Sequence, residues 1–267
     1  MTLRRLCLVL LTAVVALGAA NPAAARSMEK VLETGALRVG VSLFTPWTMQ
    51  NGAEELTGFE VDVARKLAED LGVTPVLKLY PWNELIGALE SDQIDIIAAG
   101  MSITPARALR VNFSQPYADG GVSLATNTVR TEKVEGLDDL NDETYRIAAV
   151  KGTVAEELAR RLFSRARLNL FEQSDQAAEA LLAGKVDAYL EGYPMPQFLA
   201  LENPDVVDVP LAKPLLVTRA GFAVPKGNLE FLTYLNAWIT AREADTWLPS
   251  THYYWFDSLK WRDTFEE

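Results

Sequence analysis

The chain has 267 residues, and its 36 acidic residues outnumber its 25 basic ones, which gives a formal net charge of −11 at pH 7. Such a negative charge argues against binding to nucleic acid or to an anionic membrane surface. With one cysteine and one histidine, the chain is also a poor match for a disulfide framework, a zinc site or a histidine-based catalytic triad.

The first 25 residues have the three parts of a secretory signal peptide. Arg4 and Arg5 form a basic start, residues 6–20 form an apolar run, and Ala23–Ala25 fits an A-x-A cleavage site. The apolar run is shorter than a membrane span requires. Cys7 lies inside it, so a lipid anchor on that cysteine would not survive cleavage. We therefore expect cleavage near Ala25 and a periplasmic protein without disulfides.

After residue 36, strand-like segments alternate with helix-like segments. We expect strands at residues 37–42, 76–80, 94–99, 145–150 and 186–190, and helices at residues 59–71, 82–90, 153–163, 174–183 and 229–244. In the first long helix, Phe59, Val63, Leu67 and Leu71 recur at helical spacing, and Gly72 follows as a C-cap. This alternation predicts an α/β fold with parallel sheets.

The segment from Ile94 to Tyr117 carries the clearest site chemistry. A buried strand leads to Gly100, where the backbone can approach a ligand closely. Thr104 is a good N-cap, Pro105 suits the first helical position, and Arg107 lies in the first turn. Free N–H groups and a guanidinium would then converge on one spot, which suits a carboxylate. An ordinary strand–helix loop with a surface arginine is the alternative interpretation.

A weak internal repeat relates residues 88–100 to residues 180–192. Each stretch ends a helix, makes a polar turn, places an aspartate (Asp95 or Asp187) at a strand start and finishes on glycine. At strand starts, we expect both aspartates to act in turns and not as ligands. The repeat predicts two α/β lobes of similar construction, with chance similarity between two such units as the alternative.

The two lobes need not be contiguous in the sequence. We expect residues 26–126 to begin the first lobe, residues 127–215 to form the second, and residues 216–267 to return to the first with a C-terminal helix. Extended segments at residues 122–127 and 215–224 would connect the lobes. A ligand cleft would then lie between them, at the carboxyl ends of the strands.

The chain is similar to the family 3 periplasmic solute-binding proteins of the amino-acid type, which supply ABC importers. The similarity rests on LRVGVS, TGFEVDVARKLAEDLG, PWNELIGALESDQIDIIAAGMSITPARALRVNFSQPY, KGTVAEELA and KVDAYLEG, and it covers the chain after the signal peptide. It implies a two-lobed type II periplasmic-binding-protein fold, no enzymatic activity, no cofactor and a monomer. The implied partners are a small carboxylate or amino-acid ligand and an ABC permease in the inner membrane.

The resemblance also implies which residues bind the ligand. Arg107 would clamp the ligand carboxylate, and the loop before the helix at residues 153–163 would donate backbone N–H groups to it. Aromatic side chains would enclose the rest of the ligand. The expected ligand-binding residues are Ser42, Phe44, Trp47, Trp82, Gly100, Ser102, Arg107, Thr153, Val154, Glu191 and Gly192. We expect no catalytic residue and no metal ligand.

One position departs from the family pattern. Gly192 stands where family members carry an aspartate that pairs with the ligand ammonium. Glu191 is adjacent, but in a regular strand it would face the opposite side. Three alternatives follow: Glu191 reaches the cleft through a local turn, Ser102 and backbone carbonyls bind the ammonium, or the ligand is not a simple α-amino acid.

Two other functions stay open at this point. Periplasmic cyclohexadienyl dehydratases resemble the same fold and use a glutamate just beyond the strand that contains Glu191, where this chain reads YPMPQF without a carboxylate. Glu191 itself could act as a general acid in an apolar cleft. A sensory binding protein that serves no transporter is the other alternative.

Overall fold

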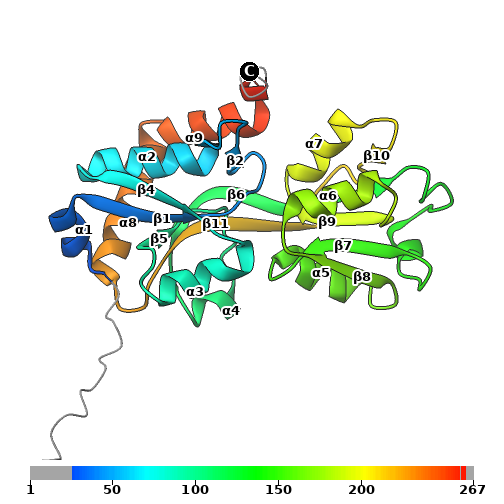
Figure 1. Ribbon diagram of the computed structural model, residues 1–267, viewed down its shortest axis with the longest axis horizontal. Coiled ribbons are helices and arrows are strands. Elements are labelled where there is room, and N and C mark those ends of the chain that lie inside the picture. The colour runs from blue at the N-terminus through cyan, green and yellow to red at the C-terminus, as the bar shows by residue number, and fades with distance from the viewer. Residues whose placement is uncertain (1–25, 259, 263–267) are drawn as a thin grey trace, which may run out of the picture.

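The computed structural model describes residues 26–258 and 260–262. The signal peptide expected at residues 1–25 lies outside the described residues. Figure 1 shows two groups of helices and strands side by side, joined by long strands that run through both. Within the described part of the chain, no helix is both long and apolar enough to cross a membrane.

The helices and strands alternate along most of the chain. The helices are α1 (Met28–Thr34), α2 (Phe59–Leu71), α3 (Leu85–Glu90), α4 (Pro105–Ala108), α5 (Val154–Leu162), α6 (Ser174–Leu182), α7 (Met195–Glu202), α8 (Leu229–Ala244) and α9 (Trp247–His252), with 3₁₀ turns η1 (Trp82–Glu84) and η2 (Leu137–Leu140) and a π-helical turn η3 (Tyr253–Asp257). The strands are β1 (Ala36–Val41), β2 (Met49–Gln50), β3 (Leu56–Thr57), β4 (Thr74–Leu79), β5 (Ile96–Ile97), β6 (Asn112–Asn127), β7 (Arg146–Val150), β8 (Arg167–Phe171), β9 (Ala188–Gly192), β10 (Val207–Asp208) and β11 (Leu216–Val224).

The main sheet runs continuously through the molecule in the order β4-β1-β5-β11-β6-β9-β7-β8, and β10 pairs with β6. At one end β1 is parallel to β4 and β5, and at the other end β7 is parallel to β8 and β9. Between them, β6 and β11 run antiparallel to each other. The parallel sets predicted from the sequence are therefore real, and two antiparallel connecting strands join them.

Each parallel set packs its own helices, and we call these two assemblies the first and second lobes. In the first lobe, Phe59 and Leu67 of α2 share a core with Phe231 and Trp238 of α8. Helix α8 therefore packs against α2 in one core. In the second lobe, α5 and α6 pack on the strands through separate clusters that include Leu158 and Leu181, respectively. The lobe boundaries at residues 126 and 216 stay a prediction, because β6 and β11 belong to both ends of the sheet.

The internal repeat appears in the hydrogen bonds of the two lobes. Asp95, just before β5, accepts from the Arg38 amide N–H at 2.7 Å and from Arg38 Nη2 at 2.6 Å. Asp187, just before β9, accepts from the Arg146 amide N–H at 2.7 Å and from Arg146 Nη2 at 2.9 Å. Both carboxylates are buried, with exposed fractions of 1% and 2%. Each aspartate thus ties the start of one strand to its neighbour, which is a structural role.

Several expected elements differ from the structure. The extended segment expected at residues 122–127 begins at Asn112 as β6, and the helix expected at residues 82–90 starts as the 3₁₀ turn η1. The strand expected at residues 94–99 is regular only at Ile96–Ile97, because the chain then leaves the sheet and turns at Gly100, whose φ is +63°. Ser174 suits an N-cap by residue type, but it is the first residue of α6, and Gln173 holds the N-cap position. The Ser174 hydroxyl instead lies 2.8 Å from the Tyr189 hydroxyl, so its hydrogen bond goes to β9.

Candidate functional site

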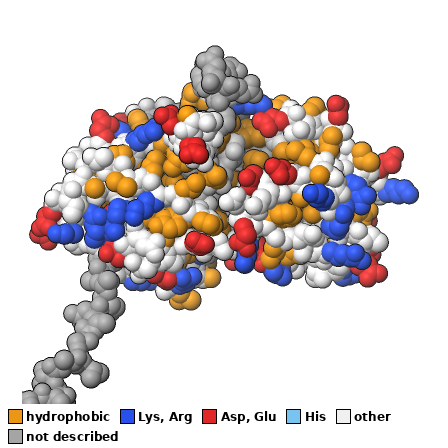
Figure 2. Space-filling view, in the orientation of Figure 1, with side chains coloured by type: hydrophobic (Ala, Val, Ile, Leu, Met, Phe, Trp, Pro, Cys, Tyr) orange, Lys and Arg blue, Asp and Glu red, His pale blue; other side chains and the backbone are white. Residues whose placement is uncertain are grey.

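Both lobes contribute to a cavity of about 220 Å³ where the lobes meet. Figure 2 shows hydrophobic side chains gathered near the middle of one face of the molecule, with charged side chains spread more widely over it. Apart from Arg107, every residue expected to bind ligand lines the cavity: Ser42, Phe44, Trp47, Trp82, Gly100, Ser102, Thr153, Val154, Glu191 and Gly192. Their contact with a ligand stays a prediction.

One end of the cavity is suited to an anion. Helix α5 begins there at Val154, and Thr153 caps it by accepting from the Glu156 amide N–H at 3.2 Å. The N–H groups of Val154 and Ala155 lie in the first turn, where a helix has no internal acceptor for them. The positive end of the helix dipole adds to their attraction for a carboxylate. The Ser102 hydroxyl belongs to the same lining and comes from the first lobe.

Arg107 lies behind this end of the cavity and is itself buried, with an exposed fraction of 9%. Its Nη1 donates to the Ser102 carbonyl at 2.9 Å, and its Nη2 donates to the Gly152 carbonyl at 3.1 Å. Trp82 Nε1 donates to the same Gly152 carbonyl at 3.1 Å. Burial lowers the pKa of Arg107, but a guanidinium stays protonated in proteins. Arg107 therefore joins the two lobes and places a positive charge next to the anion-binding end.

Glu191 lies on β9 and lines the cavity, although the strand continues regularly to Gly192 in its pairing with β6. Its Oε2 accepts from the Tyr189 hydroxyl at 2.6 Å and its Oε1 accepts from the Gly192 amide N–H at 2.7 Å. Burial raises the pKa of Glu191, and these two hydrogen bonds oppose the shift. No local turn is needed to bring Glu191 to the cavity.

The glycine at position 192 has a physical reason. A Cβ atom built on Gly192 would lie 2.4 Å from Cζ of Phe44, so a side chain there would require the ring of Phe44 to move. Phe44 belongs to the first lobe and stacks on Trp47, with ring centroids 6.2 Å apart. The ring of Phe44 therefore fills the space into which a side chain at position 192 would project.

Several further residues that line the cavity are not among those expected from the sequence. They are Leu43, Leu79, Tyr80, Pro81, Gly120, Gly121, Val150, Ala155, Glu172, Gln173, Ser174, Tyr193 and Thr218. The sequence could have predicted residues 172–174, because they follow the carboxyl end of β8 as residues 152–154 follow that of β7. In parallel sheets these ends meet at the same edge.

Glu60 supports the cavity from beneath and was also missed. Its Oε1 accepts from the Gly100 amide N–H at 2.5 Å and from the Tyr117 hydroxyl at 2.6 Å, while its buried Oε2 has no hydrogen-bond partner among the described residues. Burial raises the pKa of Glu60 to about 7. The side chain thus fixes the Gly100 peptide, which faces the ring of Trp47.

Comparison with known proteins places this architecture in a family. The sequence profile of the bacterial extracellular solute-binding proteins, family 3, matches residues 37–258. The chain belongs to this family. Among the described residues of this family 3 protein, no group of three or more His, Cys, Asp or Glu side chains could hold a metal ion.

Curated relatives of this family 3 protein include binding proteins and an enzyme. The L-cystine-binding protein TcyJ of Escherichia coli (strain K12) is 27% identical over 230 residues, which cover 86% of this chain and 85% of TcyJ. The cyclohexadienyl dehydratase of Pseudomonas aeruginosa is 23% identical over 231 residues, which cover 86% of each chain.

Solved structures agree with the two-lobed fold. The ancestral amino acid-binding protein AncCDT-1, a precursor of cyclohexadienyl dehydratase, superposes with a TM-score of 0.77 at 29% identity, covering 86% of this chain and 98% of that one. An ancestral arginine-binding protein bound to arginine gives 0.76 at 28% identity, covering 83% and 98%. The α/β type II fold predicted from the sequence is confirmed.

Proposed function

We propose that this family 3 solute-binding protein captures a small carboxylate-bearing ligand, an amino acid or a derivative, between its two lobes and delivers it to an ABC importer. The cavity accommodates a small solute, and its lining comes from both lobes. Relatives such as the L-cystine-binding protein TcyJ bind amino acids by name. After export the protein would act in the periplasm as a monomer, with an inner-membrane permease as its partner and no nucleic acid.

The observation that carries this proposal is the convergence of Arg107 and α5 across the two lobes. A ligand carboxylate between Ser102 and Thr153 would meet the first-turn N–H groups of α5, and Arg107 would stand behind it on the Ser102 and Gly152 carbonyls. Each of these positive partners would stabilise a bound carboxylate. Because the partners come from different lobes, a carboxylate there favours the closed arrangement.

A second candidate function is a dehydratase of the cyclohexadienyl type. It is supported by the relative of that name and by Glu191, a buried carboxylate in the cavity that could act as a general acid. Against it, residues 193–198 beyond β9 contain no carboxylate. Incubation with prephenate or arogenate, with phenylpyruvate or phenylalanine as the readout, tests it directly, and absence of turnover removes it.

A thermal-shift screen tests the binding function and the role of Arg107. The purified protein is screened against the twenty amino acids and their parent carboxylic acids. We expect at least one carboxylate to raise the melting temperature of the wild type, because a ligand that binds only the folded protein stabilises it by about 3 kcal/mol at a hundred times its Kd. The same ligand should stabilise Arg107→Ala less.

Arg110→Ala is the matched control for this screen. Arg110 lies three residues further along the same segment and forms an exposed ion pair with Glu90. Its variant should respond to the ligand like the wild type. Equal stabilisation of the wild type and Arg107→Ala would contradict the role of Arg107, and a wild type that no carboxylate stabilises would contradict the function itself.

A further inference from the structure

After α9, the described residues 253–258 and 260–262 form a segment rich in aromatic side chains, which we call the C-terminal segment. Trp255 and Trp261 of this segment are both buried, each with an exposed fraction of 5%. Trp255 Nε1 donates to Asp62 Oδ2 of α2 at 2.8 Å, and Trp261 Nε1 donates to the Trp255 carbonyl at 2.8 Å. These hydrogen bonds attach the C-terminal segment to the first lobe.

Helix α7 packs in the second lobe but also contacts the C-terminal segment. Leu199 packs with α6 in a core of the second lobe, whereas Phe198 packs in the core of the first lobe with Trp261. The rings of Phe198 and Trp261 meet edge to face, with centroids 5.8 Å apart. Beside them, Arg262 Nη2 forms an ion pair with Glu202 Oε1 at 3.1 Å. Figure 1 shows the last described residues, in red, where the two lobes meet, between α9 and α7.

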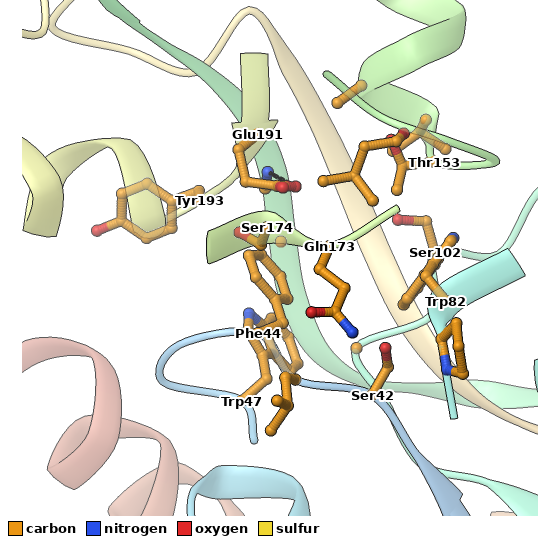
Figure 3. A pocket seen from close by; sticks show the side chains of 18 of the residues that line it. Ser42, Phe44, Trp47, Trp82, Ser102, Thr153, Gln173, Ser174, Glu191 and Tyr193 are labelled. Carbon is orange, nitrogen blue, oxygen red and sulfur yellow. Dashed lines mark hydrogen bonds between the residues drawn. The ribbon is translucent and has the colours of Figure 1, made fainter. Parts of the chain in front are cut away.

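This contact lies at the opposite end of the cavity from the bonds to Gly152. Figure 3 shows Tyr193 at one end of the cavity and Trp82, which donates to the Gly152 carbonyl, at the other. Pro194 lies between Tyr193 and the start of α7. At this end, burial and the carboxylate of Asp257 in the C-terminal segment raise the pKa of Tyr193. The lobes therefore touch at both ends of the cavity.

Both sides of the contact at α7 are joined to the walls of the cavity. On the second-lobe side, β9 ends at Gly192, and α7 begins at Met195 after two residues. On the first-lobe side, Phe256 lies against Trp47, with ring centroids 4.8 Å apart, and Trp47 lines the cavity. A change in the separation of the lobes at the cavity therefore changes the contact between α7 and the C-terminal segment.

We propose that Trp255, Trp261 and Arg262 form a clasp that holds α7 and keeps the two lobes together in the absence of ligand. Burial of the facing rings of Trp261 and Phe198 favours the arrangement in which they touch, whereas the exposed ion pair adds little. A ligand then meets a population in which the closed form is already favoured, which lowers the cost of closure. The clasp acts in the same way whichever ligand binds.

Small-angle X-ray scattering without ligand tests the clasp, because the radius of gyration rises when the lobes separate. The proteins are first unfolded in urea and refolded by dialysis, which removes any co-purified ligand. Phe198→Ala removes the contact from the side of the second lobe and leaves the tryptophans in place, and Trp261→Ala removes it from the other side. We expect both variants to have a larger radius of gyration than the wild type. Urea unfolding verifies that each variant folds.

Trp247→Ala is the matched control, because its ring packs against Trp238 of α8 in the first lobe, with centroids 6.1 Å apart. Its radius of gyration should equal that of the wild type, as should that of Trp261→Phe, which keeps a ring opposite Phe198. Should Trp261→Ala fail to fold, the comparison of Phe198→Ala with the wild type decides alone.

An unchanged radius of gyration in Phe198→Ala would overturn the proposal, as would an equal expansion of Trp247→Ala. Because the scattering needs no ligand, either result would leave the proposed function to the thermal-shift screen.

Discussion

At the scale of single residues, Glu60 links the stability of the protein to pH. Burial raises its pKa to about 7 in the folded protein, against a reference value of 4.5. The folded protein therefore holds this proton more tightly than the unfolded chain does. It follows that the stabilising contribution of protonated Glu60 is fully present below about pH 4.5 and is lost as pH rises through about 7.

Glu60→Gln should remove this contribution to the pH dependence. Glutamine is neutral at every pH and keeps an oxygen that can accept from Gly100 and Tyr117. From pH 5 to pH 8, the free energy of unfolding of the variant should therefore rise by up to about 3 kcal/mol relative to that of the wild type. Urea unfolding of both proteins at intervals of one pH unit measures this difference. Parallel pH profiles would contradict the account of Glu60.

At the same scale, the contact between Phe44 and Gly192 could not be predicted from the sequence. The sequence showed that an expected aspartate was missing at position 192. The reason is a contact between Phe44 and Gly192, which lie in different lobes. The sequence could not predict the unpaired Oε2 of Glu60 for the same reason, since the burial of this side chain depends on how distant segments pack.

At the scale of elements, prediction succeeded where local signals were complete. Helices α2 and α8 have the expected boundaries, and buried apolar side chains recur at helical spacing along each of them. It failed where the fold overrides the local pattern: β5 is shortened by the turn at Gly100, and Ser174 bonds to β9 and does not cap α6. Of the residues that line the cavity, those at the ends of β1, β5 and β7 are among the expected ones, whereas residues 172–174 are not.

Asp187, one of the two repeated aspartates, is expected to stabilise the folded protein. Burial opposes ionisation of Asp187, but hydrogen bonds from Arg146 and Arg130 prevail and lower its pKa. Asp187→Ala should cost about 1.5–3 kcal/mol in the free energy of unfolding, since it removes the buried carboxylate that accepts from the Arg146 amide and guanidinium. Glu90→Ala breaks the exposed pair with Arg110 and should cost less than about 1 kcal/mol. Urea unfolding compares the two, and equal losses would contradict the structural role of Asp187.

At the scale of the whole molecule, side chains of the first lobe bond to the second lobe at the cavity. Trp82 and Arg107 donate to the Gly152 carbonyl, and Asn83 donates to Glu172 at 3.2 Å. A ligand that contacts both lobes adds to these bonds and shifts the population towards the closed form. The main sheet runs from one lobe into the other through β6 and β11. These two strands therefore connect the lobes, both through the chain and through hydrogen bonds.

Native mass spectrometry of the purified protein tests the central claim, that one small ligand binds between the lobes. In an equimolar mixture of the twenty amino acids, we expect one adduct with the mass of a single bound ligand. Gly192→Asp should lose this adduct, because its side chain would collide with Phe44 as the lobes meet. Gly52→Asp should retain it, since no atom lies within 4 Å of a Cβ there. A wild type without any adduct, or an unchanged adduct in Gly192→Asp, would contradict the account.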